Sequence, residues 1–157
     1  MRASLVFATI AALSSQTSAH RTGPARHQVA SINTWFKARN FEEGCSPGGC
    51  EASFNLTANA DSATGMPGFD VVCHPIYIQQ GFVTCDAVTP LKDKEIVASW
   101  WTEASVEENI KLVFEHIWLA PDGNNKYNAS GSVEFPGSGV ENFTVHITNL
   151  TVIDLND

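Results

Sequence analysis

Residues 143–153, which read FTVHITNLTVI, decide the fold class of this chain. Phe143, Val145 and Ile147 alternate with threonine and histidine, so the apolar side chains fall on one side of an extended backbone. A period of two residues is typical of a β-strand that buries one face and leaves the other in water. The stretch therefore predicts a half-buried strand in a β-protein.

The rest of the chain supports an all-β fold. Segments rich in β-branched and aromatic residues are separated by turns that contain proline, glycine, asparagine and aspartate. Such short strands predict a compact antiparallel β-sandwich or β-barrel. At 157 residues the chain fits one β domain, expected over residues 28–157. The expected strands are 29–37, 51–58, 69–76, 81–87, 95–102 and 143–153.

One segment fits two structures. Ser105 and Glu108 have the spacing of a helix capping box, and apolar residues follow at helical intervals, which allows a short helix near 105–117. Apolar residues also alternate over 109–119, and the Asp122-Gly123 turn follows directly. We favour the strand over 109–119 and keep the helix as the alternative.

The N-terminus has the pattern of a secretion signal over residues 1–19. Arg2 supplies a positive charge, residues 5–13 are apolar, and Ala19 follows small residues that suit cleavage. The apolar stretch is too short to span a bilayer, so we expect no membrane span. We expect the protein to be secreted and extracellular, with a mobile lead over residues 20–27.

Four cysteines fit two disulfides in an oxidising compartment. Three pairings are possible, and we favour Cys45 with Cys50 and Cys73 with Cys85, because the turn residues between each pair allow the chain to reverse. The spacing is not that of zinc ligands, and we expect no metal site and no cofactor.

Four glycosylation sequons agree with secretion. Several such tripeptides behind a signal peptide predict that some carry glycan, which requires an accessible surface. The candidate asparagines are Asn55, Asn128, Asn142 and Asn149.

The net charge of −8 argues against a nucleic-acid-binding surface. Loops are free to diverge while alternating strands maintain the core, so partner contacts are expected in the connections 60–68, 89–94 and 121–127. Each connection contains an aspartate that would attract a basic partner surface. The predicted partner-binding residues are Asp61, Asp93 and Asp122.

Catalytic patterns are weak, and we expect no enzyme activity. The adjacent carboxylates of Glu42-Glu43 and Glu107-Glu108 point to opposite sides of an extended chain and are expected in solvated turns, and no Gly-x-Ser-x-Gly motif occurs. Cleavage after Ala19 would expose His20, which with a second histidine could bind copper as a histidine-brace enzyme does. We rank this copper enzyme below a binding role, because residues 20–27 form a polar lead outside the predicted strands.

Exposed tryptophans provide another alternative, a carbohydrate-binding module. Trp35, Trp100, Trp101 and Trp118 are the candidates for a stacking platform. Because Trp100 and Trp101 are neighbours, they face opposite sides of a strand, and at least one of them is expected in the core.

Several segments resemble the major Alternaria allergen-like family of secreted fungal proteins. They are residues 31–39 (SINTWFKAR), an acidic turn at 42–44, residues 53–59 (SFNLTAN), the Val71-Val72-Cys73 run followed by Cys85, and residues 129–136 (ASGSVEFP), which resemble a late family strand.

The resemblance implies a compact β-barrel-like fold. It implies that the protein acts as an effector or elicitor, as some family members do, and some of these contribute to virulence. It also implies that the protein binds a host (plant) extracellular defence protein, with the thaumatin-like class as the candidate, and modulates immunity. The chain departs from the family pattern because no cysteine follows Cys85 and the early unpaired cysteine is absent. A covalent dimer is therefore not expected.

Overall fold

The protein is a nearly closed antiparallel β-barrel of nine strands, to which a short N-terminal strand is added. The computed structural model describes residues 26–29, 34–77, 81–121 and 123–154. The predicted signal peptide, His20 and Asp122 lie outside these residues. The strands of the described residues are β1 (Arg26–Val29), β2 (Trp35–Ser46), β3 (Gly49–Ala58), β4 (Phe69–Cys73), β5 (Val83–Thr84), β6 (Asp86–Ala87), β7 (Ile96–Thr102), β8 (Asn109–Leu119), β9 (Asn125–Pro136) and β10 (Phe143–Asp154).

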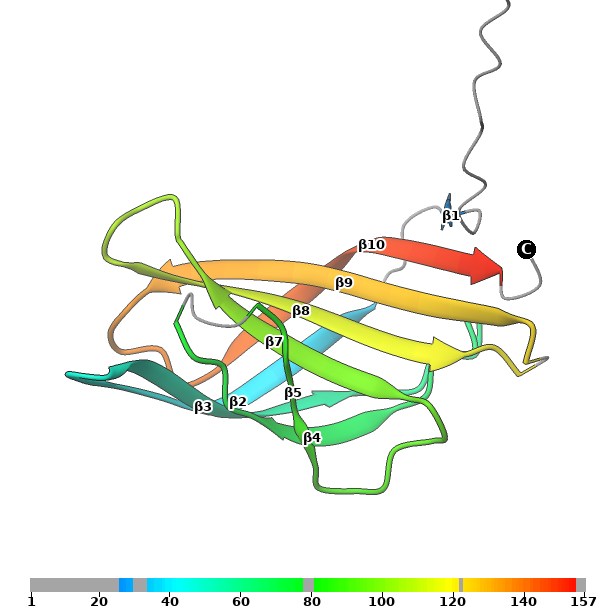
Figure 1. Ribbon diagram of the computed structural model, residues 1–157, viewed down its shortest axis with the longest axis horizontal. Coiled ribbons are helices and arrows are strands. Elements are labelled where there is room, and N and C mark those ends of the chain that lie inside the picture. The colour runs from blue at the N-terminus through cyan, green and yellow to red at the C-terminus, as the bar shows by residue number, and fades with distance from the viewer. Residues whose placement is uncertain (1–25, 30–33, 78–80, 122, 155–157) are drawn as a thin grey trace, which may run out of the picture.

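The strands follow one continuous path, β5-β7-β8-β9-β10-β2-β3-β4-β6, and β1 pairs with β10. Figure 1 shows the long strands β8 and β9 side by side, while β2 and β3 form a second long pair. The two ends of the path meet at residues 83–87, where β5 pairs with β7 and β6 pairs with β4. This short segment is the seam of the barrel.

Alternation of side chains creates the interior. Along β8, Ile110, Leu112, Phe114, His116 and Trp118 are buried, while the residues between them are half-buried. The strand prediction for 109–119 is confirmed, and the alternative helix near 105–117 is wrong. Ser105 does not cap a helix, because its backbone N–H and hydroxyl donate to the carboxylate of Glu134 on β9.

Aromatic rings fill much of the core. Phe54 lies near Phe41, Phe114 and Phe143, with ring centroids 5.6–6.0 Å apart. Phe36 meets Phe69 edge to face at 5.1 Å. These rings come from strands on several sides of the barrel, so their contacts hold those sides together.

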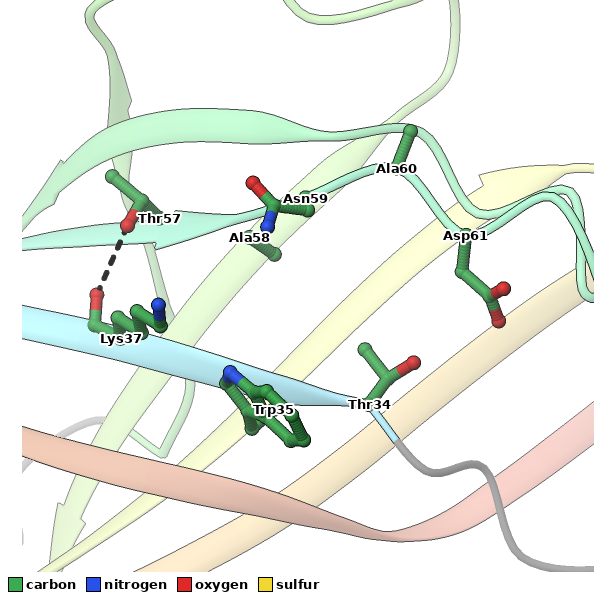
Figure 2. Close-up of a pocket in the computed structure, with 8 residues that line it drawn as sticks. All are labelled: Thr34, Trp35, Lys37, Thr57, Ala58, Asn59, Ala60 and Asp61. Carbon is green, nitrogen blue, oxygen red and sulfur yellow. Dashed lines mark hydrogen bonds between the residues drawn. The ribbon is translucent and has the colours of Figure 1, made fainter.

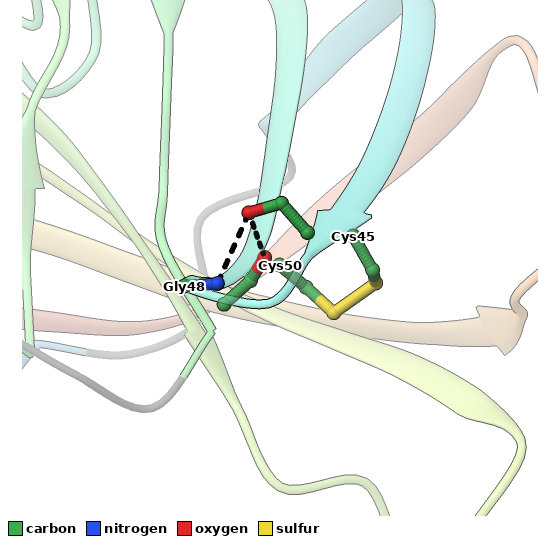
Figure 3. The surroundings of a disulfide bond; sticks show 5 residues. Cys45, Gly48 and Cys50 are labelled. Carbon is green, nitrogen blue, oxygen red and sulfur yellow. Dashed lines mark hydrogen bonds between the residues drawn. A yellow bond between two sulfur atoms is a disulfide. The ribbon is translucent and has the colours of Figure 1, made fainter.

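Both predicted disulfides are present. Cys45 and Cys50 are directly opposed in the β2–β3 hairpin and are bonded to each other (Figure 3). Next to them, the hydroxyl of Ser46 accepts from the N–H of Gly48 at 3.3 Å. Cys73 at the end of β4 is bonded to Cys85 in the seam. No described cysteine is left unbonded.

Several expectations about the elements need correction. Residues 26 and 27, expected in the mobile lead, belong to β1, and the strand expected over 29–37 is replaced by β1, which ends at Val29, and β2, which begins at Trp35. The acidic turn expected at 42–44 belongs to β2, which continues to Ser46 after a bulge between Arg39 and Glu42. The single strand expected over 81–87 is two strands that pair with different neighbours. The strand β9 begins at Asn125, before the stretch in which the family resemblance implied a strand.

Within the part of the chain that the structure describes, no helix has the length and apolar character needed to cross a bilayer.

Candidate functional site

A groove of about 210 Å³ lies beside Trp35 at the start of β2 (Figure 2). Trp35 and Lys37 approach it from β2, and Thr57 and Asn59 approach it from β3 and the residue after it. Asp61, in the connection between β3 and β4, closes one end. The groove therefore places an aromatic surface among hydroxyl, amide, ammonium and carboxylate groups.

The alternation along β2 directs Trp35 outwards. Phe36 and Ala38 are buried in the barrel, so Trp35 and Lys37 lie on the outer face. Trp35 is 43% exposed, which is unusual for such a large apolar side chain. An exposed tryptophan in a groove is a typical contact for a partner or a sugar ring.

Asp61 has a structural role in its loop. One carboxylate oxygen accepts from the N–H of Ala63 at 3.0 Å, and the other accepts from the hydroxyl of Thr64 at 2.9 Å. The backbone of Asp61 also pairs with Met66. The half-buried carboxylate thus stabilises the turn that borders the groove.

The predicted partner-binding loops approach one another at this end of the barrel. Asp61 and Lys92 line a common cleft, which brings the connections 60–68 and 89–94 together. Gly65 lies against Pro121, at the start of the third connection. Asp93 is exposed and lies between Lys92 and Lys94 in the chain. The described residues therefore place the three connections side by side, whereas Asp122 itself lies outside the described residues.

The four sequon asparagines differ in their surroundings. Asn142 is exposed, next to β10. Asn55 and Asn128 are half-buried, and each bonds to a neighbouring side chain, Asn55 to Asn40 and Asn128 to Glu115. Asn149 is half-buried on β10. Glycosylation of all four remains a prediction, and Asn142 has the most accessible side chain.

The remaining tryptophans do not form an open platform. Trp101 and Trp118 are buried, and Trp100 is half-buried against Phe82, with ring centroids 5.9 Å apart. The expectation that at least one of the Trp100-Trp101 pair lies in the core is confirmed. Of the described tryptophans, Trp35 is thus the one whose side chain is well exposed, and it lines a groove.

Three histidines of the described residues differ in their surroundings. His116 is buried in the core, where its Nε2 lies 2.8 Å from the Oε1 of Glu95. Burial lowers the pKa of His116, and the hydrogen bond and charge of Glu95 partly oppose that change. His146 is exposed on β10, where it is the cross-strand partner of Trp35, and His74 lies 3.9 Å from Glu51. The described residues contain no group of three or more His, Cys, Asp or Glu side chains that could hold a metal ion, and the predicted His20 site lies outside them.

A second cleft, of about 640 Å³, was not expected from the sequence. Glu43, Glu107 and Glu108 line it together with Tyr77 and Trp101, whose ring centroids are 5.3 Å apart. Burial raises the pKa of Glu43. Sequence spacing does not indicate that β2, which contributes Glu43, and the β7–β8 turn, which contributes Glu107 and Glu108, meet at this cleft.

No protein family model, curated protein or solved structure matches the chain.

Proposed function

We propose that the chain is a secreted binding protein of the effector or elicitor type, which binds a host extracellular defence protein and modulates immunity. The disulfides are compatible with an extracellular location. The family resemblance in the sequence adds support for a partner among plant defence proteins, with the thaumatin-like class as the candidate.

One observation carries this proposal. The exposed Trp35 and its groove lie at the same end of the barrel as the connections 60–68, 89–94 and 121–127. Tryptophan is enriched among the residues that contribute most to protein–protein binding, and loops on a rigid scaffold are the usual place for partner contacts. The barrel, closed by the Cys73–Cys85 bridge, provides that scaffold.

The proposal is tested by affinity capture from plant extracellular fluid with the purified protein. We expect a specific retained protein, and we expect Trp35→Ala to weaken its retention at least ~10-fold, as for a typical hot-spot residue. Phe82→Ala is the matched control, because Phe82 is 41% exposed and lies outside the groove. Failure to retain a specific protein, or equal retention by both variants, would contradict the proposal.

The groove also supports a second function, carbohydrate binding. Trp35 offers a ring face for stacking, and Thr57, Asn59 and Lys37 offer polar groups for sugar hydroxyls. Retention of oligosaccharides rather than of a protein would favour this function. The same Trp35→Ala and Phe82→Ala variants test whether the sugar binds in the groove.

A further inference from the structure

The outer face of β2 bears a strip of three exposed residues, Trp35, Lys37 and Arg39, which we call the Trp-Lys-Arg strip. They occupy alternate positions, so their side chains leave the same face at intervals of about 6.7 Å. The strip places a lysine and an arginine beside an aromatic ring on a chain whose net charge is −8.

Neighbouring strands extend the strip into a wider surface. Lys37 is paired with Thr144 of β10 and with Thr57 of β3. A second groove, of about 210 Å³, lies on the other side of Lys37 and is lined by Arg39, Asn142 and Thr144 among others. Because Lys37 lines both grooves, they provide space along the strip on both sides of its ammonium group.

Among the described residues, the two cations have no acidic partner. Within the part of the chain that the structure describes, neither Lys37 nor Arg39 forms an ion pair, since the ion pairs there join His74 to Glu51 and His116 to Glu95. Asp61 lies at the Trp35 end, and its two oxygens accept bonds from Ala63 and Thr64. The strip therefore retains positive charge that an anionic ligand would compensate.

We propose that the Trp-Lys-Arg strip binds an acidic oligosaccharide, a chain of uronic-acid residues. This inference rests on the second function above, carbohydrate binding, and specifies its ligand class. A sugar ring stacks on Trp35, while carboxylates farther along the ligand bind the ammonium of Lys37 and the guanidinium of Arg39, whose planar fork matches a carboxylate. Thr57, Asn59 and Thr144 offer hydrogen bonds to the hydroxyls of such a ligand. These stacking and hydroxyl-binding groups favour an acidic sugar over another polyanion.

The test measures binding of hexagalacturonate by titration calorimetry, with its fully methyl-esterified form as the neutral counterpart. The protein is produced without glycans, because Asn142 lines the groove beside Arg39. We expect the acid to bind ~10-fold more tightly than the ester. The affinity for the acid should fall as the salt concentration is raised, because exposed charges are screened. Trp35→Ala and the double variant Lys37→Gln/Arg39→Gln each should lose ~10-fold or more in affinity.

Lys111→Gln is the matched control, since Lys111 lies on β8, outside the grooves of the strip. This variant should bind hexagalacturonate with the affinity of the wild type. Circular dichroism verifies that every variant is folded. Equal binding of acid and ester, or undiminished binding by the Lys37/Arg39 variant, would overturn the inference while leaving carbohydrate binding intact. Polyglutamate bound as tightly as hexagalacturonate would overturn the assignment to sugar. Binding of neither saccharide would overturn the inference, and the retention of other oligosaccharides then decides the second function. Capture of a host protein is measured separately and is unaffected by these outcomes.

Discussion

Glu134 shows how one carboxylate determines the shape of a turn. Its oxygens accept from the N–H and hydroxyl of Ser105, from the N–H of Val106 and from the amide of Asn109. These bonds lower the pKa of Glu134 to about 2, and the hydroxyl of Ser105 makes the largest contribution. The carboxylate thus connects the β7–β8 turn to β9.

We expect Glu134→Gln to loosen this turn without unfolding the barrel, because an amide has one acceptor oxygen where the carboxylate has two. Hydrogen exchange at the amides of Ser105 and Val106 should become several-fold faster. Glu107→Gln, in the same turn, is the control. In the wild type the contribution of Glu134 is present above the unfolded pKa of 4.5 and is lost as the pH falls through about 2. Unchanged exchange in Glu134→Gln would contradict this role.

The buried pair of His116 and Glu95 predicts a pH-dependent stability. Burial lowers the pKa of His116 below its usual 6.5, so the unfolded chain takes up a proton that the folded chain resists. The free energy of unfolding should therefore fall as the pH drops below 6.5, by at most about 1.4 kcal/mol per pH unit for one proton. Urea unfolding at a series of pH values between 5 and 8, a range set by the usual histidine pKa of about 6.5, measures this slope.

Two substitutions isolate the residue responsible. His116→Gln should remove this part of the slope, although it also lowers stability at every pH because the core must accommodate a new polar group. His146→Gln should leave the slope unchanged, since His146 is exposed. If the slope survives in His116→Gln, another group causes it.

At the scale of elements, the seam of the barrel depends on a short segment. β5 and β6 have two residues each, and the N–H of the intervening Cys85 donates to Val97 of β7. The Cys73–Cys85 bridge joins that segment to β4, and both cysteines are buried. The Cys45–Cys50 bridge, by contrast, joins two strands that already pair along most of their length.

We expect removal of the seam bridge to destabilise the protein more than removal of the hairpin bridge. In the chain-entropy model a disulfide that closes a loop of about 15 residues contributes roughly 3 kcal/mol, and shorter loops contribute less. The two sequence separations are 12 for Cys73–Cys85 and 5 for Cys45–Cys50. Thermal unfolding of the double alanine variants of each pair measures the difference, and an equal or larger loss for Cys45/Cys50 would contradict the seam's role.

Sequence patterns identified the strands whose burial alternates and missed those determined by their neighbours. In β8, every second residue from Ile110 to Trp118 is apolar, and this alternation correctly favoured a strand. The first half of β9 reads NKYNAS, which has few apolar residues, and its conformation is determined by pairing with β8 and β10. The division of residues 81–87 follows from two different partners, which no local pattern reveals.

The candidate site was predictable only in part for the same reason. From the sequence alone, Asp61 is expected at a loop contact and Trp35 at a stacking platform, and the two are not connected. The structure places them in one groove, because β2 and β3 pair in a register that brings Trp35 close to the end of β3. Long-range register also assembles the Trp-Lys-Arg strip with Thr57 and Thr144.

At the scale of the whole molecule, charge is distributed unevenly over a negative chain. Lys37 and Arg39 lie on the outer face of β2, whereas the connections at the end of the barrel contain both signs of charge, Asp61 and Asp93 near Lys92 and Lys94. A basic surface of a host protein would contact the aspartates of the loop end, and an acidic saccharide would be attracted to the strip. The two proposed ligands thus differ in which charges they require.

The aspartates of the connections 89–94 and 121–127 therefore provide a test of host-protein binding that does not involve the strip. Asp93→Asn/Asp122→Asn should weaken capture of the host protein, chiefly through a slower association rate, and the effect should shrink at physiological salt. The melting temperature should stay within about 2 °C, because surface substitutions usually change stability by under about 0.5 kcal/mol. Asp61→Asn is examined separately, because Asp61 also holds its own turn through Ala63 and Thr64. If capture is unchanged at both low and physiological salt, Asp93 and Asp122 do not contact the partner. The Trp35 groove is then the better candidate for the contact surface.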